Sequence, residues 1–201
     1  MLIIDTAERM FGDATIDAVS LRAVARQAGL GTRAVTYHFP SKRDLVAAVM
    51  RRRAPALGQP MAERLAALTR SETAPSVRDV VEAILVPFVN LLREDPRGVL
   101  RWIKVFAQLA LTKDQIWADE LGTDPSIADL FVTAAGRALP EIGDEKVQRR
   151  AGIAMYSMIT MLANTDRTAY GQPLGADGLD PDWVEQLVIF TTAGLQGRID
   201  R

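Results

Sequence analysis

The chain has 201 residues, of which 48% are hydrophobic and 24% are charged, as in an ordinary globular protein. It contains no cysteine, which excludes disulfide cross-links, thiol catalysis and cysteine-bound zinc. The formal net charge is −1, but residues 1–53 hold nine Lys and Arg against five Asp and Glu, so the remainder is acidic. A basic segment on an acidic body indicates a nucleic-acid-binding module, although Arg51, Arg52 and Arg53 can equally form a solvated helix face.

The N-terminus does not have the pattern of a signal peptide. Asp5 and Glu8 interrupt its apolar stretch, and no basic residues precede that stretch. No apolar run reaches the roughly 18–20 residues that a membrane span needs. We therefore expect a cytoplasmic protein.

The first part of the chain predicts a helix, followed by two short helices joined by a tight turn. Residues 2–11 are amphipathic, and Gly12 is expected to end this helix. A second helix is expected over residues 20–28, with its first serine as the cap. Two glycines within residues 29–31 break it, and a third helix covers residues 32–38. Helix, glycine turn and short helix form the helix-turn-helix pattern.

The third predicted helix has a polar face suited to DNA. Val35 and Phe39 are enough to pack it onto the preceding helix. Hydroxyls and an arginine near the helix start can contact base edges, and Tyr, His and Lys can contact phosphates. An ordinary polar face over a core is the alternative, which we consider less favoured because the whole ordered pattern is present. The expected DNA-contacting residues are Ser20, Thr32, Arg33, Thr36, Tyr37, His38 and Lys42.

These residues resemble the DNA-binding domain of the TetR family of one-component transcriptional regulators. The resemblance is specific over residues 1–49 and rests on Ala7, Phe11, Gly12, Leu21, Val24, Ala25, Ala28, Gly29, Ala34, Val35, Tyr37, His38, Phe39, Ser41, Lys42 and Leu45. It implies that the third helix faces DNA and that Lys42 contacts a phosphate at a helix N-terminus. The sequence departs from the family at Thr36, where a tyrosine is common, so we expect a weaker contact there.

A fourth helix is expected to begin at Lys42, with Ser41 and Asp44 in capping-box spacing. Pro55 and Pro60 are expected to kink or break it, because proline cannot donate the helical hydrogen bond. The segment 54–60 is then either a hinge between domains or a plain loop, and residues 61–68 resume the helix. We accordingly divide the chain into a DNA-binding domain, residues 1–50, and a helical ligand-binding and dimerisation domain, residues 51–201.

The rest of the chain predicts further helices. Ser76 is placed to cap residues 77–93, and three Asp-Pro pairs, at 95–96, 124–125 and 180–181, are placed to open helices. The helices expected after these pairs are residues 97–112, 126–139 and 182–196; residues 115–121 and 144–167 are also expected to be helical. No segment has the two-residue period of a strand. The expected fold is all-α, with about nine helices and no sheet.

The last two predicted helices, about 144–167 and 182–196, carry more apolar residues than a one-sided surface helix needs. We expect them to form a homodimer as a four-helix bundle, as the resemblance also implies; burial within one chain is the alternative. The resemblance implies a sensor pocket in the body for a small, largely apolar effector, while plain core packing remains the alternative for each residue. The candidate pocket residues are Phe88, Asn90, Leu92, Trp102, Phe106, Gln108, Trp117, Phe131, Met155 and Met158.

An enzyme is not expected. His38 is the only histidine, and the sequence shows no nucleophile–base pair and no metal-binding spacing. The glycines within residues 171–178 do not follow a predicted strand, as a phosphate-binding loop would. No cofactor or metal is expected; an enzyme using carboxylates such as Glu82 or Asp166 is a remote alternative. The leading hypothesis is a ligand-responsive regulator, most simply a repressor, that binds a palindromic operator on double-stranded DNA. The alternatives are a helical DNA-binding protein without an effector and a helical ligand-binding module with a degraded DNA-binding unit.

Overall fold

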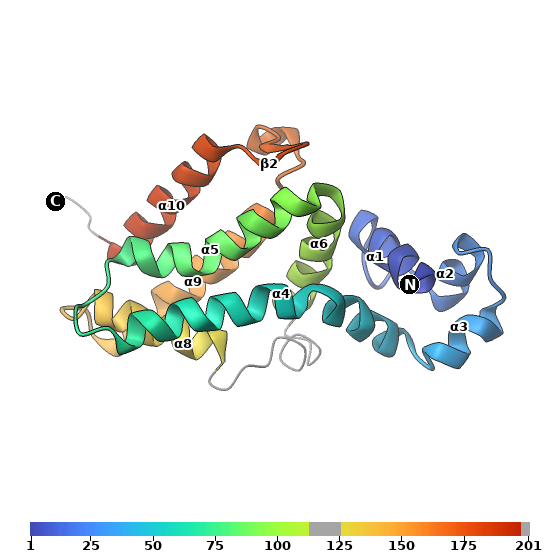
Figure 1. The fold of residues 1–201 in the computed structure, drawn as a ribbon, viewed down its shortest axis with the longest axis horizontal. Coiled ribbons are helices and arrows are strands. Elements are labelled where there is room, and N and C mark those ends of the chain that lie inside the picture. Colours follow the sequence, from blue (N-terminus) through green and yellow to red (C-terminus); the bar gives the residue numbers. More distant parts are fainter. Residues whose placement is uncertain (113–125, 198–201) are drawn as a thin grey trace.

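The computed structural model describes residues 1–112 and 126–197, and within these ranges the chain forms nine α-helices (Figure 1). The helices are α1 (Leu2–Asp13), α2 (Leu21–Gln27), α3 (Thr32–His38), α4 (Lys42–Arg70), α5 (Val77–Glu94), α6 (Pro96–Thr112), α8 (Ile127–Ala138), α9 (Asp144–Leu162) and α10 (Pro181–Gln196). The all-α expectation is therefore confirmed. The expected helix at 115–121 and the pair Asp124-Pro125 lie outside the described residues.

Helices α1 to α3 form a small unit at one end of an elongated molecule (Figure 1). Its core consists of side chains that are fully or almost fully buried: Ala7, Phe11, Val24, Ala25, Val35 and Leu45. These are the apolar positions of the helical pattern in the sequence, so the amphipathic period defines the inner faces. Gly12 does not end α1, as we had predicted, but lies buried within its last turn, where α6 passes close by.

Helix α4 leaves this unit and continues into the body as one helix of 29 residues, about 43 Å long. The predicted break at residues 54–60 is wrong. Pro55 and Pro60 each remove one backbone donor, but the buried side chains of Ala54, Leu57 and Met61 pack the same stretch against the body. Tertiary packing therefore outweighs the local cost of the prolines.

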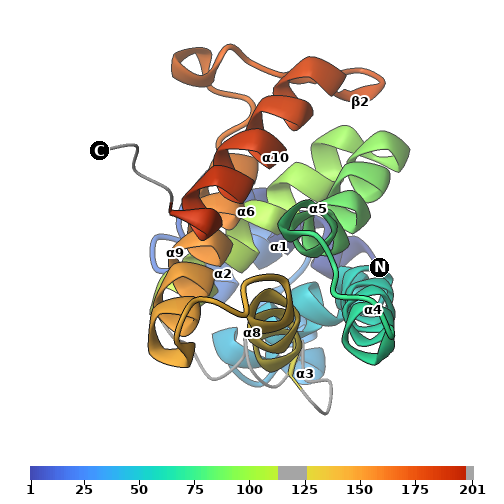
Figure 2. The ribbon, with the colours of Figure 1, turned by 90° about the vertical axis from the view of Figure 1, so that its left-hand side faces the viewer.

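The body consists of α5, α6, α8, α9 and α10 together with the distal part of α4, which lies along one edge and packs on α5 and α8 (Figures 1 and 2). The predicted caps are confirmed at Ser41, Ser76, Asp95 and Asp180, each of which accepts a hydrogen bond from a backbone amide in the first helical turn. Ser41 and Ser76 both form full capping boxes, with Asp44 and Asp79. For α8 the cap is Ser126, one residue after the Asp-Pro pair that we expected to open the helix.

The connection between α9 and α10 differs from the prediction. Helix α9 ends at Leu162 and not near residue 167, and a 3-10 turn (Thr168–Tyr170) follows. Two short antiparallel strands, β1 (Leu174–Gly175) and β2 (Gly178–Leu179), then form a hairpin. Each strand has only two residues, too few to show a strand period in the sequence. Along the described ranges no helix is long and apolar enough to cross a membrane.

Candidate nucleic-acid interface and its connection to the body

Helix α3 is held against α2 by a short turn and one buried side chain. The Ser20 hydroxyl accepts a hydrogen bond from the amide of Ala23 and caps α2. Gly29 follows the end of α2 at φ +68°, a conformation that favours glycine, and the amide of Leu30 donates to the carbonyl of Ala25. Val35 is fully buried beneath α3. The spacing between the two helices is therefore fixed by backbone geometry and by a single apolar contact.

The opposite side of α3 faces away from the molecule and is exposed. The exposed residues there are Thr32, Arg33, Thr36, Tyr37 and His38. Tyr37 is 84% exposed, and its ring meets the ring of His38 edge to face, with centroids 5.2 Å apart. Among the described residues, the Arg33 guanidinium forms no hydrogen bond or ion pair. An unpaired cation, hydroxyls and an aromatic phenol on one short helix are groups that can bind phosphates and base edges.

Lys42 lies next to this face but is engaged within the protein. Its ammonium group donates to the carbonyl oxygens of Ile16, at 3.1 Å, and Asp17, at 3.4 Å. These contacts tie the start of α4 to the segment that follows α1. The side chain that we expected at a phosphate thus has a structural role in the free protein.

A close contact between α1 and α6 joins the small unit to the body. A Cβ atom at Gly12 would lie 2.7 Å from the Cβ of Arg101, so only glycine allows this approach. Beside it, Asp13 and Arg101 form an ion pair at 3.0 Å. The Gln108 side chain accepts from the amide of Ile16 at 2.7 Å and donates to the carbonyl of Phe11 at 3.2 Å. Gln108 therefore satisfies polar backbone groups at the end of α1.

Ion pairs join α1, α4 and α6 on the other side of this contact. Arg53 contacts Glu8 at 3.3 Å and Asp95 at 2.6 Å, and Glu8 is only 4% exposed. Burial alone would lower the pKa of Arg53, but hydrogen bonds and charge from Glu8 and Asp95 outweigh it and raise that pKa. Burial likewise opposes ionisation of Asp95, yet Arg53 and the amide of Gly98 hold the pKa of its carboxyl below the ordinary value.

Trp102 links α6 directly to α4. Its indole nitrogen donates to the carbonyl oxygens of Val49, at 3.1 Å, and Met50, at 3.2 Å, and the side chain is fully buried. The ring stacks on Phe106, with centroids 5.5 Å apart. A shift of α6 would therefore have to move α4 as well.

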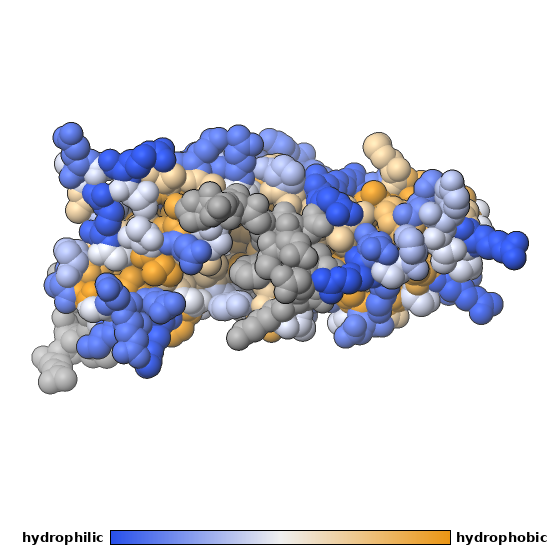
Figure 3. All heavy atoms as spheres, turned by 90° about the horizontal axis from the view of Figure 1, so that it is seen from below, coloured by the Kyte–Doolittle hydropathy of each residue, from blue (hydrophilic) through white to orange (hydrophobic). Residues whose placement is uncertain are grey.

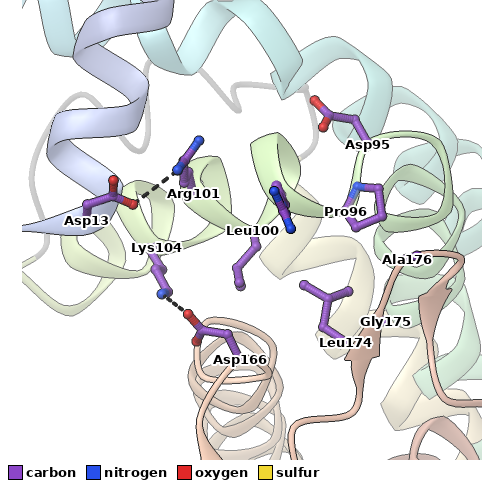
Figure 4. Close-up of a pocket in the computed structure, with 11 residues that line it drawn as sticks. Asp13, Asp95, Pro96, Leu100, Arg101, Lys104, Asp166, Leu174, Gly175 and Ala176 are labelled. Carbon is purple, nitrogen blue, oxygen red and sulfur yellow. Dashed lines mark hydrogen bonds and ion pairs between the residues drawn. The ribbon is translucent and has the colours of Figure 1, made fainter.

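A groove of about 680 Å³ runs along the exposed side of α6 (Figure 4). The end of α1, the first half of α6 and the hairpin enclose it. Two ion pairs cross it, Asp13 with Arg101 and Lys104 with Asp166, the latter at 2.6 Å. Arg101 and Lys104 are thus paired with carboxylates, and Arg97 adds a third cation to the lining. A groove lined by these charges does not suit an apolar ligand.

A second, more apolar groove of about 210 Å³ lies between α8 and α9. Phe131, Val132, Met155 and Ile159 form its apolar lining, with Asp129, Gln148 and Tyr156 among its polar groups. On the underside of the molecule, hydrophobic atoms come to the surface at the end where α8 lies (Figure 3). Of the expected pocket residues, Phe131 and Met155 line this groove.

The other expected pocket residues lie elsewhere. Phe88, Leu92, Trp102, Phe106 and Met158 are buried in the continuous core, where the aromatic rings pack on one another. Asn90 is exposed, so it contributes no polar group to an apolar interior. Gln108 bonds to α1, as described above, and Trp117 lies outside the described residues.

An apolar face is exposed where α9 and α10 lie side by side (Figure 2). It carries Ile153, 68% exposed, and Phe190, 72% exposed, with Ile189 and Tyr156 nearby on the same helices. Ile153 and Phe190 both border a small hollow between the two helices. The hydroxyl oxygens of Thr191 and Thr192 are buried and have no hydrogen-bond partner within the described ranges. Large exposed apolar side chains of this kind indicate a contact surface.

Two family models match the chain. The model described as bacterial regulatory proteins, tetR family, covers residues 3–49, and the model described as tetracyclin repressor-like, C-terminal domain, covers residues 82–194. The chain belongs to the TetR family. TetR-family proteins are DNA-binding transcriptional regulators and not enzymes, so the expectations of family and of a non-enzymatic role are confirmed. No curated protein matches the chain.

Solved TetR-family structures share the fold along almost the whole chain. A regulator from Streptomyces coelicolor is 20% identical, with a TM-score of 0.52 and coverage of 98% of each chain. One from Legionella pneumophila is 16% identical, with a TM-score of 0.54 and coverage of 94% of this chain and 93% of that one. One from Rhodococcus sp. RHA1 is 16% identical, with a TM-score of 0.50 and coverage of 99% of this chain and 96% of that one.

The residues that join the TetR-type DNA-binding unit to the body are not evident from local sequence patterns. In the sequence Arg53 belongs to a basic triplet and Asp95 has the position of a helix cap, but the two form an ion pair. Glu8 stands three residues before Phe11, close to the buried face of an amphipathic helix. This position is the one indication in the sequence that the Glu8 carboxylate is buried. A carboxylate on a buried face requires a cationic partner.

Proposed function

We propose that this TetR-family protein is a ligand-responsive repressor that binds a palindromic operator as a homodimer and is released by a small, largely apolar effector. Residues 1–50 would bind DNA, and residues 51–201 would bind the effector and the second copy. The observation that carries the proposal is the outer face of α3, where Thr32, Arg33, Thr36 and Tyr37 are exposed above a fully buried Val35.

Dimer formation is supported by the apolar face on α9 and α10. Exposed Ile153 and Phe190 would become buried against the same face of a second copy, because a two-fold interface uses one patch on both subunits. The unpaired hydroxyls of Thr191 and Thr192 lie on the same helix as Phe190 and could find partners across that interface. Two α3 helices related by a two-fold axis would then contact half-sites about 34–36 Å apart, or a multiple of that distance.

The effector site that the contacts support best is the groove between α8 and α9. Its lining of Phe131, Val132, Met155 and Ile159 suits a small apolar molecule, with Asp129 and Gln148 to orient it. Helix α8 packs along α4, so a ligand that displaces α8 would push on a continuous helix that begins directly after α3. Arg53 and Gln108 bind α1 and the segment after it, and Trp102 ties α6 to α4, so the α1–α3 unit would move together with α4.

A second candidate function, DNA binding without an effector, is favoured by one observation. Among the described residues, the aromatic rings of Phe88, Trp102 and Phe106 are buried and pack on one another, so they fill the space that they were expected to line. In that case the α8–α9 groove would be a surface irregularity.

The experiment that tests the proposal begins with selection of genomic DNA fragments by the full chain. A selected duplex is then titrated by fluorescence anisotropy in the presence and absence of a panel of small aromatic compounds. The proposal expects a pseudo-palindromic site and a compound that weakens binding at least tenfold, with Met155→Trp, which fills the groove, abolishing that response. Specific DNA binding that no compound alters would favour the effector-free function, and no enriched sequence would contradict both.

A further inference from the structure

The hydroxyl of Thr36 is already used inside α3. The hydroxyl group donates to the carbonyl oxygen of Thr32 at 3.1 Å, and its oxygen lies 3.3 Å from the carbonyl oxygen of Arg33. A threonine within a helix commonly turns its hydroxyl back to these carbonyls. The hydroxyl proton is therefore not free for a base. The exposed Thr36 side chain offers an external partner its methyl group and the acceptor lone pairs of its oxygen.

Arg33 stands one turn before Thr36 and has the opposite character. It is exposed, and within the described residues its guanidinium has no partner, so both of its donor pairs are available. Residues three apart on a helix share a face, with Cβ atoms about 5–6 Å apart. Base pairs in B-DNA are stacked about 3.4 Å apart, so these two side chains can contact base pairs one or two steps apart.

We propose that Thr36 determines operator specificity through its methyl group, by apolar contact with the 5-methyl of a thymine that lies one or two base pairs from a guanine bound by Arg33. The major groove presents the thymine methyl as its one apolar feature, and it presents guanine O6 and N7 as a pair of acceptors that matches an arginine fork. The inference rests on the proposed DNA-binding function and assigns the base chemistry at that same face.

The experiment uses the full chain and its selected operator, with two substitutions of Thr36 that separate methyl from hydroxyl. Thr36→Val keeps a methyl at the same place and removes the hydroxyl, whereas Thr36→Ser keeps the hydroxyl and removes the methyl. The operator is made with dT or with dU at the thymine, which deletes only the 5-methyl. Circular dichroism of each variant checks that α3 remains folded.

The expected result is a three- to fivefold loss of affinity for wild type when dT becomes dU, the size of one buried methyl contact. Thr36→Val should keep wild-type affinity within about twofold and remain sensitive to dU. Thr36→Ser should bind the dT operator three- to fivefold more weakly and no longer distinguish dT from dU. The contact of Arg33 with guanine serves as a reference. Replacing that guanine with 7-deaza-dG should lower the operator affinity of wild type about tenfold and that of Arg33→Ala much less.

The opposite pattern overturns the inference. If Thr36→Ser binds like wild type while Thr36→Val loses affinity, the hydroxyl and not the methyl contacts the base. If dU has no effect on wild type, the thymine methyl is not contacted. Both results would leave DNA binding itself intact, whereas failure of wild type to select any sequence would remove the proposed function and this inference together.

Discussion

The Gln108 side-chain oxygen accepts a hydrogen bond from the Ile16 amide at 2.7 Å, across 92 residues of sequence. The same side chain donates to the carbonyl of Phe11, a group near the end of α1 that has no later helical turn to bond to. One glutamine on α6 thus satisfies a donor and an acceptor of the DNA-binding unit. The position of α3 relative to the body depends on such contacts because α1 packs on α6.

Gln108→Leu should loosen this junction. The substitution keeps the side-chain size but leaves the Ile16 amide and the Phe11 carbonyl without their partner, at a cost of about 1–3 kcal/mol in the free energy of unfolding. Chemical denaturation measures the loss, and hydrogen exchange at the Ile16 amide should accelerate. Gln59→Leu, which removes a bond to Glu63 on the exposed side of α4, is the control and should cost less than about 0.5 kcal/mol. Equal losses in the two variants would show that Gln108 does not secure the junction.

Gly12→Ala should separate α1 from α6. The new methyl would lie 2.7 Å from the Cβ and 2.8 Å from the Cα of Arg101, so backbone must move. We expect a loss of about 1–3 kcal/mol, despite the better helix propensity of alanine. Gly136→Ala in α8, where no atom lies within 4 Å of the new methyl, should instead stabilise by up to about 1 kcal/mol. Thermal unfolding of both variants tests this contrast, and a stabilised Gly12→Ala would contradict the packing described.

Asp95→Asn should have a lower free energy of unfolding than wild type only at pH values where the wild-type carboxylate is ionised. Because the folded-state pKa of Asp95 lies below its ordinary value of 3.8, its contribution is complete above about pH 4 and is lost as pH falls through that lower pKa. The side chain is half exposed, so solvent screening limits the loss at pH 7 to about 0.5–1 kcal/mol. Asp177→Asn, in the exposed hairpin turn, is the matched control. A difference between Asp95→Asn and wild type that does not shrink as the pH falls below 3.8 would argue against the ion pair with Arg53 as its cause.

Much of this architecture could be predicted from the sequence because helix signals are local. Ser41 with Asp44, and Ser76 with Asp79, place helix starts by hydrogen bonds within three residues. The burial of Val35 beneath α3 follows equally from a helical period of apolar residues.

The errors come from effects that act across the fold. Pro55 and Pro60 carry a strong local signal against a helix, yet α4 runs through both since its buried side chains pack on the body. Arg53 and Glu8 are 45 residues apart, and nothing local indicates that they pair. Trp102 and Phe106 are buried and stacked in the core, and the sequence pattern of apolar residues does not distinguish core packing from the lining of a pocket.

Phe190→Glu should separate the proposed dimer. Phe190 is 72% exposed on α10, so a glutamate there is tolerated in a single copy but would place two like charges at a two-fold interface. Size-exclusion chromatography with light scattering should show a dimer for wild type and a monomer for Phe190→Glu at micromolar protein, with operator affinity reduced at least tenfold. Ala67→Glu, an exposed position on α4, introduces the same charge and should remain dimeric. An unchanged mass for Phe190→Glu would place any interface elsewhere.

In the proposed complex, two α3 helices that are paired through α9 and α10 bind one operator. Sedimentation equilibrium of the full chain with a selected duplex measures this stoichiometry directly. Wild type should bind as two chains per duplex, and Phe190→Glu should show only weak binding of single chains. One chain per duplex at full affinity, from a DNA site without inverted symmetry, would contradict it.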